Sequence, residues 1–200
     1  MSLPELQRML ARLVTASDLR EGFLDDPEGV ADALGWDAQM AGVLATVPPD
    51  QLRHYGESLV NKRCREAARC LPLTFKALGD SRFRTRFREY AGQSTTRGPA
   101  RHRDDAILFA HVLRSERSDA SKNPAWLADL AAYEGASLRA GDPKRRIVLL
   151  PLGHSPRDLA KAALSGDSAA IIPRRSCFIV WIRVTENGPF RHFRLSIPKA

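Results

Sequence analysis

Apolar residues in the first 140 positions recur at three- and four-residue steps, the spacing that places them on one face of an α-helix. The clearest stripe is made of Leu6, Met9, Leu10, Leu13 and Val14. Proline, glycine and acidic residues at the ends of such patterns predict helices over residues 3–16, 17–24, 27–34, 37–47, 50–71, 73–78, 81–91, 103–114 and 123–140. The first part of the chain is therefore expected to be helical.

Several of these helices have a predictable apolar face. The helix at 81–91 carries Phe83, Phe87 and Tyr90 on one side, and the helix at 103–114 is expected to bury Ile107, Leu108 and either His111 or Val112. The stripe of the helix at 123–140 consists of Trp126, Leu127, Leu130 and Tyr133. Because this last helix precedes a change of pattern, we expect it to pack the helical part onto the residues that follow.

After Gly141-Asp142-Pro143 the period changes from helical steps to alternation. A short strand at 145–150 and a helix at 155–164 precede two strands joined at Glu186-Asn187-Gly188, a sequence that suits a tight hairpin turn. The first strand of this hairpin is apolar on both faces: Phe178, Val180, Ile182 and Val184 on one, Cys177, Ile179 and Trp181 on the other. We therefore expect helices to cover one face, and a partner to use part of the other face or an edge.

The sequence thus predicts an α+β protein with a helical domain at residues 1–140 and a small β-α-β-β unit at residues 141–200, either winged-helix-like or a peptide-recognition sheet. The basic charge belongs to this second part. From Gly141 onward eleven Lys/Arg stand against four Asp/Glu, a formal charge of +7, which leaves +1 for the first 140 residues. Such asymmetry favours an anionic partner, although arginines on a solvated surface would give the same count.

No apolar run approaches the roughly 20 residues of a membrane span, and no apolar signal-peptide core follows Met1, so we expect a cytoplasmic protein without a membrane partner. The chemistry-bearing residues are scattered. The histidines (His54, His102, His111, His154, His192) and the cysteines (Cys64, Cys70, Cys177) form no metal-ligand spacing. A nucleophile motif and a glycine-rich phosphate loop are also missing, so nothing in the sequence argues for catalysis or a cofactor.

The basic unit permits three interpretations. As a winged helix it would place residues 155–164 in a DNA groove, but that helix offers only Arg157 and Lys161 and a second helix is lacking. As a peptide receptor it would accept an extended segment at a free sheet edge. The third interpretation is a structural subdomain that binds no ligand.

In the helical part, the loop Arg97-Gly98-Pro99-Ala100-Arg101-His102 is either a partner contact or a solvated connector.

Four groups of residues resemble one protein family. They are Leu71-Pro72-Leu73-Thr74, the Phe83/Phe87/Tyr90 helix, Gly98-Pro99-Ala100-Arg101-His102 with Asp104-Asp105, and Pro124-x-Trp126-Leu127-x-x-Leu130-x-x-Tyr133-Glu134. The family comprises the helical partner proteins of multinuclear non-haem iron-dependent oxidases, including the methanobactin partner subunit. The similarity covers roughly Leu3 to Leu138, and the unit after Gly141 is similar in kind more than in residues.

This resemblance implies a non-catalytic subunit that forms a heterodimer with the oxidase and presents a ribosomally made precursor peptide to it, with the iron on the oxidase. An acidic leader peptide would suit the basic unit. We expect the leader to add to the sheet along the edge at 145–150 or at 177–184. Arg145, Arg175 and Arg183 would pair with its acids, and Ile179 and Trp181 would line its apolar pockets. Arg97, Arg101 and His102 would contact the oxidase.

Two other functions remain open from the sequence. A DNA-binding transcriptional regulator would use the basic unit as a winged helix, and its affinity would fall steeply with salt. A stand-alone enzyme is the third hypothesis, and it has no motif in its favour.

Overall fold

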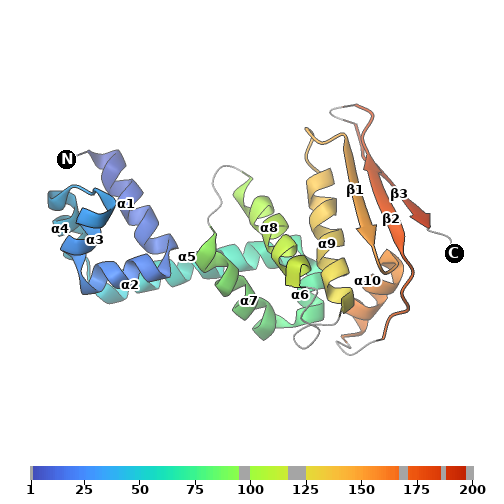
Figure 1. The fold of residues 1–200 in the computed structure, drawn as a ribbon, viewed down its shortest axis with the longest axis horizontal. Coiled ribbons are helices and arrows are strands. Elements are labelled where there is room, and N and C mark those ends of the chain that lie inside the picture. The colour runs from blue at the N-terminus through green and yellow to red at the C-terminus, as the bar shows by residue number, and fades with distance from the viewer. Residues whose placement is uncertain (1, 95–99, 117–124, 167–170, 186–187, 197–200) are drawn as a thin grey trace. The chain divides into compact units, whose positions relative to one another are not determined.

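A computed structural model describes residues 2–94, 100–116, 125–166, 171–185 and 188–196, which form nine α-helices followed by a three-stranded antiparallel sheet with a tenth helix inserted between its first two strands (Figure 1). The helices are α1 (Leu3–Thr15), α2 (Ser17–Asp25), α3 (Pro27–Leu34), α4 (Ala38–Ala45), α5 (Pro49–Cys70), α6 (Pro72–Leu78), α7 (Asp80–Gln93), α8 (Arg101–Ser115), α9 (Ala125–Ala140) and α10 (Pro156–Ser165). The strands are β1 (Ile147–Leu152), β2 (Cys177–Ile182) and β3 (Arg191–Ser196). The predicted α+β class and the β-α-β-β order of the C-terminal elements are confirmed.

The chain divides into two compact units that differ from the expected domains. The first unit contains residues 1–65 and 88–95, and the second contains residues 66–87 and 96–200. The expected division lay between residues 140 and 141. Helices α6, α8 and α9 instead belong with the sheet, because α9 packs on β1 and β2 while α6 and α8 pack on α10 and α9.

The first unit has a core built from the apolar faces of its short helices. Met9 and Leu13 from α1 meet Phe23 from α2 and Met40 and Leu44 from α4, all of them buried. Their spacing in the sequence is the helical spacing that predicted α1 and α4. This core holds the N-terminal helices together.

The ends of these short helices follow from individual residues. Asp26 accepts a hydrogen bond from the Gly29 N–H (2.9 Å) at the start of α3, and Asp37 does the same for the Met40 N–H (2.9 Å) at the start of α4. Gly35 ends α3 with a φ of 64°, in the left-handed region that glycine tolerates best.

The helices of the second unit pack around aromatic rings. Phe109 of α8 makes edge-to-face contacts with Phe83 and Phe87 of α7, each at 5.2 Å between ring centroids. The predicted buried side of the helix at 81–91 is thereby confirmed. On α8 the expected face is wrong: Leu108 and His111 are exposed, and the buried residues are Asp105, Ala106, Phe109, Ala110 and Leu113.

Helix α9 connects the helices of this unit to the sheet. Its Tyr133 ring packs on the Trp181 ring of β2 at 5.7 Å between centroids, which confirms the expected packing of this helix on the β unit. Two buried acids add polar links. Glu134 accepts hydrogen bonds from the N–H groups of Leu73 (3.0 Å) and Thr74 (2.8 Å), the orphan donors in the first turn of α6.

The second acid of α9, Asp129, binds the turn that follows β1. Its Oδ2 accepts a hydrogen bond from the Gly153 N–H (2.8 Å) and lies 2.7 Å from Nδ1 of His154. Both Asp129 and His154 are buried. The two acids of α9 therefore hold the start of α6 and the end of β1 against the same helix.

Candidate functional site

The two faces of the sheet have different environments. The strand order is β1-β2-β3, and residues directly opposite one another in an antiparallel pair point to the same face. The face toward α9 is made of Val148, Leu150, Leu152, Cys177, Ile179 and Trp181, all buried. The prediction that Ile179 and Trp181 line a peptide pocket is therefore wrong: both lie in the core, and Trp181 packs on Tyr133.

The opposite face, which we call the open face, consists of Ile147, Leu149, Pro151, Phe178, Val180, Ile182, Arg191, Phe193 and Leu195. Eight of these nine side chains are apolar. The outer strands carry the most exposed ones: Ile147 is 65% exposed, Leu149 59% and Leu195 56%. No helix among the described residues packs on this face, and Figure 1 shows α9 on the other side of the sheet. Monomeric proteins rarely expose a contiguous apolar patch of this kind without using it.

A hollow of about 440 Å³ lies at the end of the open face where β2 leads into β3. Ile182, Arg191 and Phe193 of the open face form one wall, and Val184 and Pro189 contribute to the other. The lining is mostly apolar with one guanidinium. Such a hollow can take a large apolar side chain whose neighbour carries an acid.

The free edges of the sheet follow from the hydrogen-bond pattern. The Arg183 N–H donates to the Arg146 carbonyl (2.8 Å), so the backbone groups of Arg146 face β2. Because this direction alternates along a strand, Ile147, Leu149 and Pro151 turn their backbone groups outward. Pro151 has no N–H, and its carbonyl oxygen lies 3.4 Å from Nη2 of Arg114, which donates to it. The outer edge of β1 is therefore only partly free.

The outer edge of β3 is uninterrupted. The same alternation directs the backbone groups of Arg191, Phe193 and Leu195 toward β2 and those of His192, Arg194 and Ser196 outward. All six residues of β3 are exposed. The alternative predicted edge, at 177–184, is not available because β2 is the central strand and pairs on both sides.

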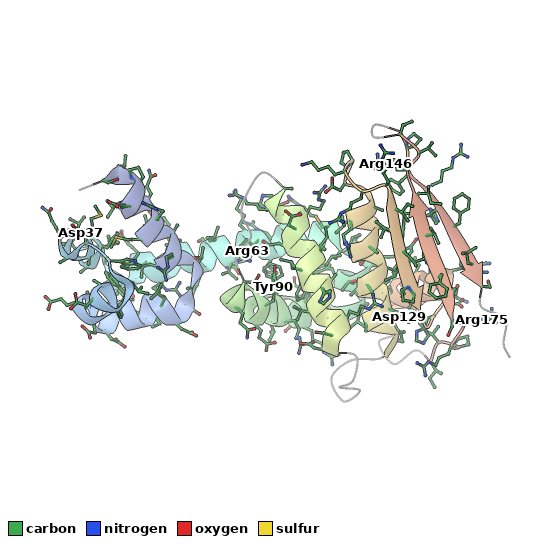
Figure 2. The ribbon with its side chains drawn as sticks, turned by 45° about the horizontal axis from the view of Figure 1, so that its top comes forward. Asp37, Arg63, Tyr90, Asp129, Arg146 and Arg175 are labelled. Atoms are coloured by element: carbon green, nitrogen blue, oxygen red, sulfur yellow. The ribbon has the colours of Figure 1, made fainter. Side chains whose placement is uncertain are left out.

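Of the three arginines predicted to bind a peptide, two are exposed and one makes hydrogen bonds within the chain. Arg145 and Arg175 are exposed, and Figure 2 shows Arg175 and the neighbour of Arg145, Arg146, at opposite ends of the sheet. Arg183 is used within the chain: its Nη1 donates to the Gly188 carbonyl (2.7 Å) and its Nη2 to the Ala140 carbonyl (3.1 Å). Arg183 thus joins the end of β2 to the end of α9. Arg191, on the open face, was missed because its strand was not aligned with β2.

The predicted oxidase contacts lie around the start of α8. Arg97 lies outside the described residues. Arg101 is the first residue of α8 and is exposed, and His102 follows it with a half-buried side chain.

Titratable residues of the described chain do not gather into a metal site: no group of three or more His, Cys, Asp or Glu side chains is placed to hold an ion. Burial raises the pKa of the Cys177 thiol on the covered face.

None of the described helices has both the length and the apolarity needed to cross a membrane.

Comparison with known proteins finds one family. Residues 44–115, from the end of α4 through α8, match the family model described as SCO6045-like, C-terminal domain. No curated protein matches the chain. The matched residues lie within the stretch on which the resemblance to the iron-oxidase partners rests, and the family's description makes no link to those partners. The chain is thus similar to the SCO6045-like C-terminal domain over about a third of its length.

Proposed function

We propose that this protein is a non-catalytic docking protein whose C-terminal sheet binds an acidic, partly apolar segment of another chain. The observation that carries the proposal is the open face, with eight apolar side chains in contiguous rows beside the free outer edge of β3. Covering this surface would remove apolar area from water, the main driving force of most protein association.

Strand addition at β3 supplies the geometry. An extended segment paired with β3 would exchange backbone hydrogen bonds with the outward groups of His192, Arg194 and Ser196. Its side chains would point alternately to the two faces of the sheet. Those on the open face would continue the row formed by Phe193 and Leu195, and a large one would enter the hollow beside Arg191.

The charge of the C-terminal part favours an acidic occupant over a second copy of the chain. Residues 141–200 carry a formal charge of +7, and Arg191 lies on the open face itself. Two copies meeting at this face would bring like charges together, which disfavours pairing. Acidic side chains flanking an apolar segment would instead meet Arg191 and the exposed Arg145 and Arg175.

The resemblance to oxidase partners gives the proposal its specific form. The segment would be the leader of a ribosomally synthesised precursor peptide, and the protein would present it to an iron-dependent oxidase in a heterodimer. Arg97, Arg101 and His102 would contact the oxidase. The iron and the chemistry would belong to the oxidase.

Co-expression with the products of neighbouring reading frames, followed by pull-down, tests the specific form: recovery of an iron-containing oxidase and a short peptide is expected.

The docking surface is tested by fluorescence anisotropy with a labelled peptide that alternates glutamate with valine or phenylalanine. Two variants with the same charge change are compared, Arg191→Glu on the open face and Arg157→Glu on α10. We expect Arg191→Glu to weaken binding about tenfold or more and Arg157→Glu to weaken it by about twofold at most.

A second pair of variants tests the edge. Arg194→Pro removes an outward N–H from β3, whereas Arg194→Ala removes the same side chain and keeps that donor. Only the proline variant should lose affinity beyond the effect of the side chain. Equal affinities in both pairs would refute the docking surface. Duplex DNA that displaces the peptide, with Arg157→Glu as damaging as Arg191→Glu, would favour the DNA-binding regulator instead.

A further inference from the structure

A pocket of about 280 Å³ lies within the first unit, separate from the residues of the sheet, and its lining is mixed polar and apolar. Three segments of this unit form it: the turn from α1 to α2, the middle of α5, and the last turns of α7. Its lining residues include Thr15, Ser17, Arg20, Gly56, Glu57 and Arg88. Two arginines and one carboxylate thus line a space that is large enough for a small molecule, whereas the hydroxyls of Thr15 and Ser17 already donate to the Ala11 carbonyl (2.6 Å) and to Asp18 (3.2 Å).

Arg20 is the most unusual member of the pocket. It is only 8% exposed, and its Nε donates to Oε1 of Glu21 over 3.3 Å. Neither terminal nitrogen of the guanidinium makes a hydrogen bond to another described residue. A buried charge normally has partners, because removing it from water costs free energy that only hydrogen bonds and counter-charges offset. The pocket is where a partner for these nitrogens would lie.

Glycine at position 56 is what admits this guanidinium. A Cβ at Gly56 would collide with Nη1 of Arg20 and lie 3.0 Å from its Cζ. The arginine head therefore rests on the backbone of α5 at the one residue of that turn without a side chain. An alanine at this position would push the guanidinium aside and fill part of the pocket.

Glu21 compensates Arg20 only in part, because it is shared with a second arginine. Arg53 donates to Oε2 of Glu21 from both Nε (3.0 Å) and Nη2 (2.8 Å). These two bonds are shorter than the single bond from Arg20 and belong to a fork geometry that suits a carboxylate. Glu21 therefore meets Arg20 only at Nε and does not bind its two terminal nitrogens.

The start of α2 adds backbone donors. Its N-cap is Ala16, which has no side-chain acceptor, so no side chain caps the first N–H groups of the helix. Ser17, the first residue of α2, lines the pocket. The positive end of a helix dipole favours an anion at this position.

We propose that this pocket binds the oxoanion group of a small molecule, a phosphate or a carboxylate, between Arg20, Arg88 and the first turn of α2. Arg88 is exposed, donates to Oδ1 of Asn61 (3.3 Å) and forms no ion pair with a described residue. Two acids oppose binding. Glu57 lines the pocket, and Asp18 accepts a hydrogen bond from the Ser17 hydroxyl (3.2 Å). Binding depends on the two arginines outweighing them.

The test is a titration of the ¹⁵N-labelled full chain followed by NMR, with inorganic phosphate in one series and succinate in another. Sodium chloride keeps the ionic strength constant. We expect saturable shifts of the backbone amides of Ser17, Arg20 and Gly56 and of the Nε–H signal of Arg20. Saturation with phosphate alone identifies a phosphate site, and saturation with succinate identifies a carboxylate site.

Variants separate the pocket from general surface charge. Gly56→Ala should weaken binding about tenfold or more, because it displaces the charged donor. Arg88→Met should weaken it about two- to fivefold, as expected for an exposed charge, while Arg82→Met on the same helix and outside the pocket should leave it unchanged. Glu57→Gln should tighten it by a similar factor. The spectrum of each variant shows that it is folded. Absence of saturable shifts with both anions, or equal effects of Arg88→Met and Arg82→Met, would overturn the proposal.

Discussion

The contrast between the two faces of the sheet yields a quantitative prediction about stability. Ile179 and Leu149 are of similar size and lie on adjacent strands, but Ile179 is 1% exposed and Leu149 is 59% exposed. Ile179→Ala removes buried methyl groups and leaves a cavity against α9, at a cost of about 2–5 kcal/mol. Leu149 is buried over only about two-fifths of its surface, and full burial of a leucine contributes about 1.5–3 kcal/mol. Leu149→Ala should therefore cost about 1 kcal/mol.

Urea denaturation followed by tryptophan fluorescence measures this difference. A Trp36→Phe background leaves Trp126 and Trp181, both in the second unit, as the reporters of its unfolding. Ile179→Ala should lower the free energy of unfolding by at least about 1 kcal/mol more than Leu149→Ala. Equal large losses would mean that the open face is already covered in the isolated chain. That result would refute the argument that it awaits a partner.

Three further substitutions test contacts within the second unit. Burial raises the pKa of Glu134 above 4.5, although its hydrogen bonds with Thr74 and Leu73 oppose the shift. The carboxyl group of Glu134 therefore keeps its proton to a higher pH in the folded protein than in the unfolded chain. The free energy of unfolding of the wild type, relative to that of Glu134→Gln, should fall as the pH rises from 4.5 through the folded pKa. Urea titrations at a series of pH values measure this difference. Gly135→Ala would place a Cβ 2.9 Å from that of Ala110, and overpacking of about 1–3 kcal/mol should outweigh a helix-propensity gain of about 1 kcal/mol. A higher melting temperature by circular dichroism would contradict this. Arg183→Met loses two charged hydrogen bonds to backbone carbonyls and should cost about 2 kcal/mol in denaturant titrations, whereas the exposed Arg175→Met should stay within about 0.5 kcal/mol.

The helical elements were predictable because their signals are local. Pro27 and Gly35 bound α3 where expected, and Asp26 and Asp37 cap helices as their positions in the sequence indicate. The stripe of Met9 and Leu13 identifies the buried side of α1 without reference to any other element. Such short-range rules need only neighbouring residues, and they carry over from sequence to structure directly.

The functional surface was less predictable because it depends on long-range pairing. Both faces of β2 are apolar, so its sequence does not tell which face α9 covers, and Ile179 and Trp181 were assigned to the wrong one. The hairpin partner of β2 was expected, but its other partner, β1, is separated from it in the sequence by α10, so the central position of β2 could not be read from the sequence. On α8, apolar residues occur on more than one side, and the packing of α8 on α9 buries the side that contains Ala106, Phe109 and Ala110. In each case a tertiary contact selected between locally equivalent choices.

The alternating backbone direction along β3 divides its amides into two classes with different rates of hydrogen–deuterium exchange. Amides that face β2, those of Arg191, Phe193 and Leu195, are bonded within the sheet, whereas those of His192, Arg194 and Ser196 meet solvent. Every second amide of the strand should therefore exchange rapidly in the isolated chain. A bound strand would slow that fast set alone, so the occupancy of this edge can be followed one residue at a time.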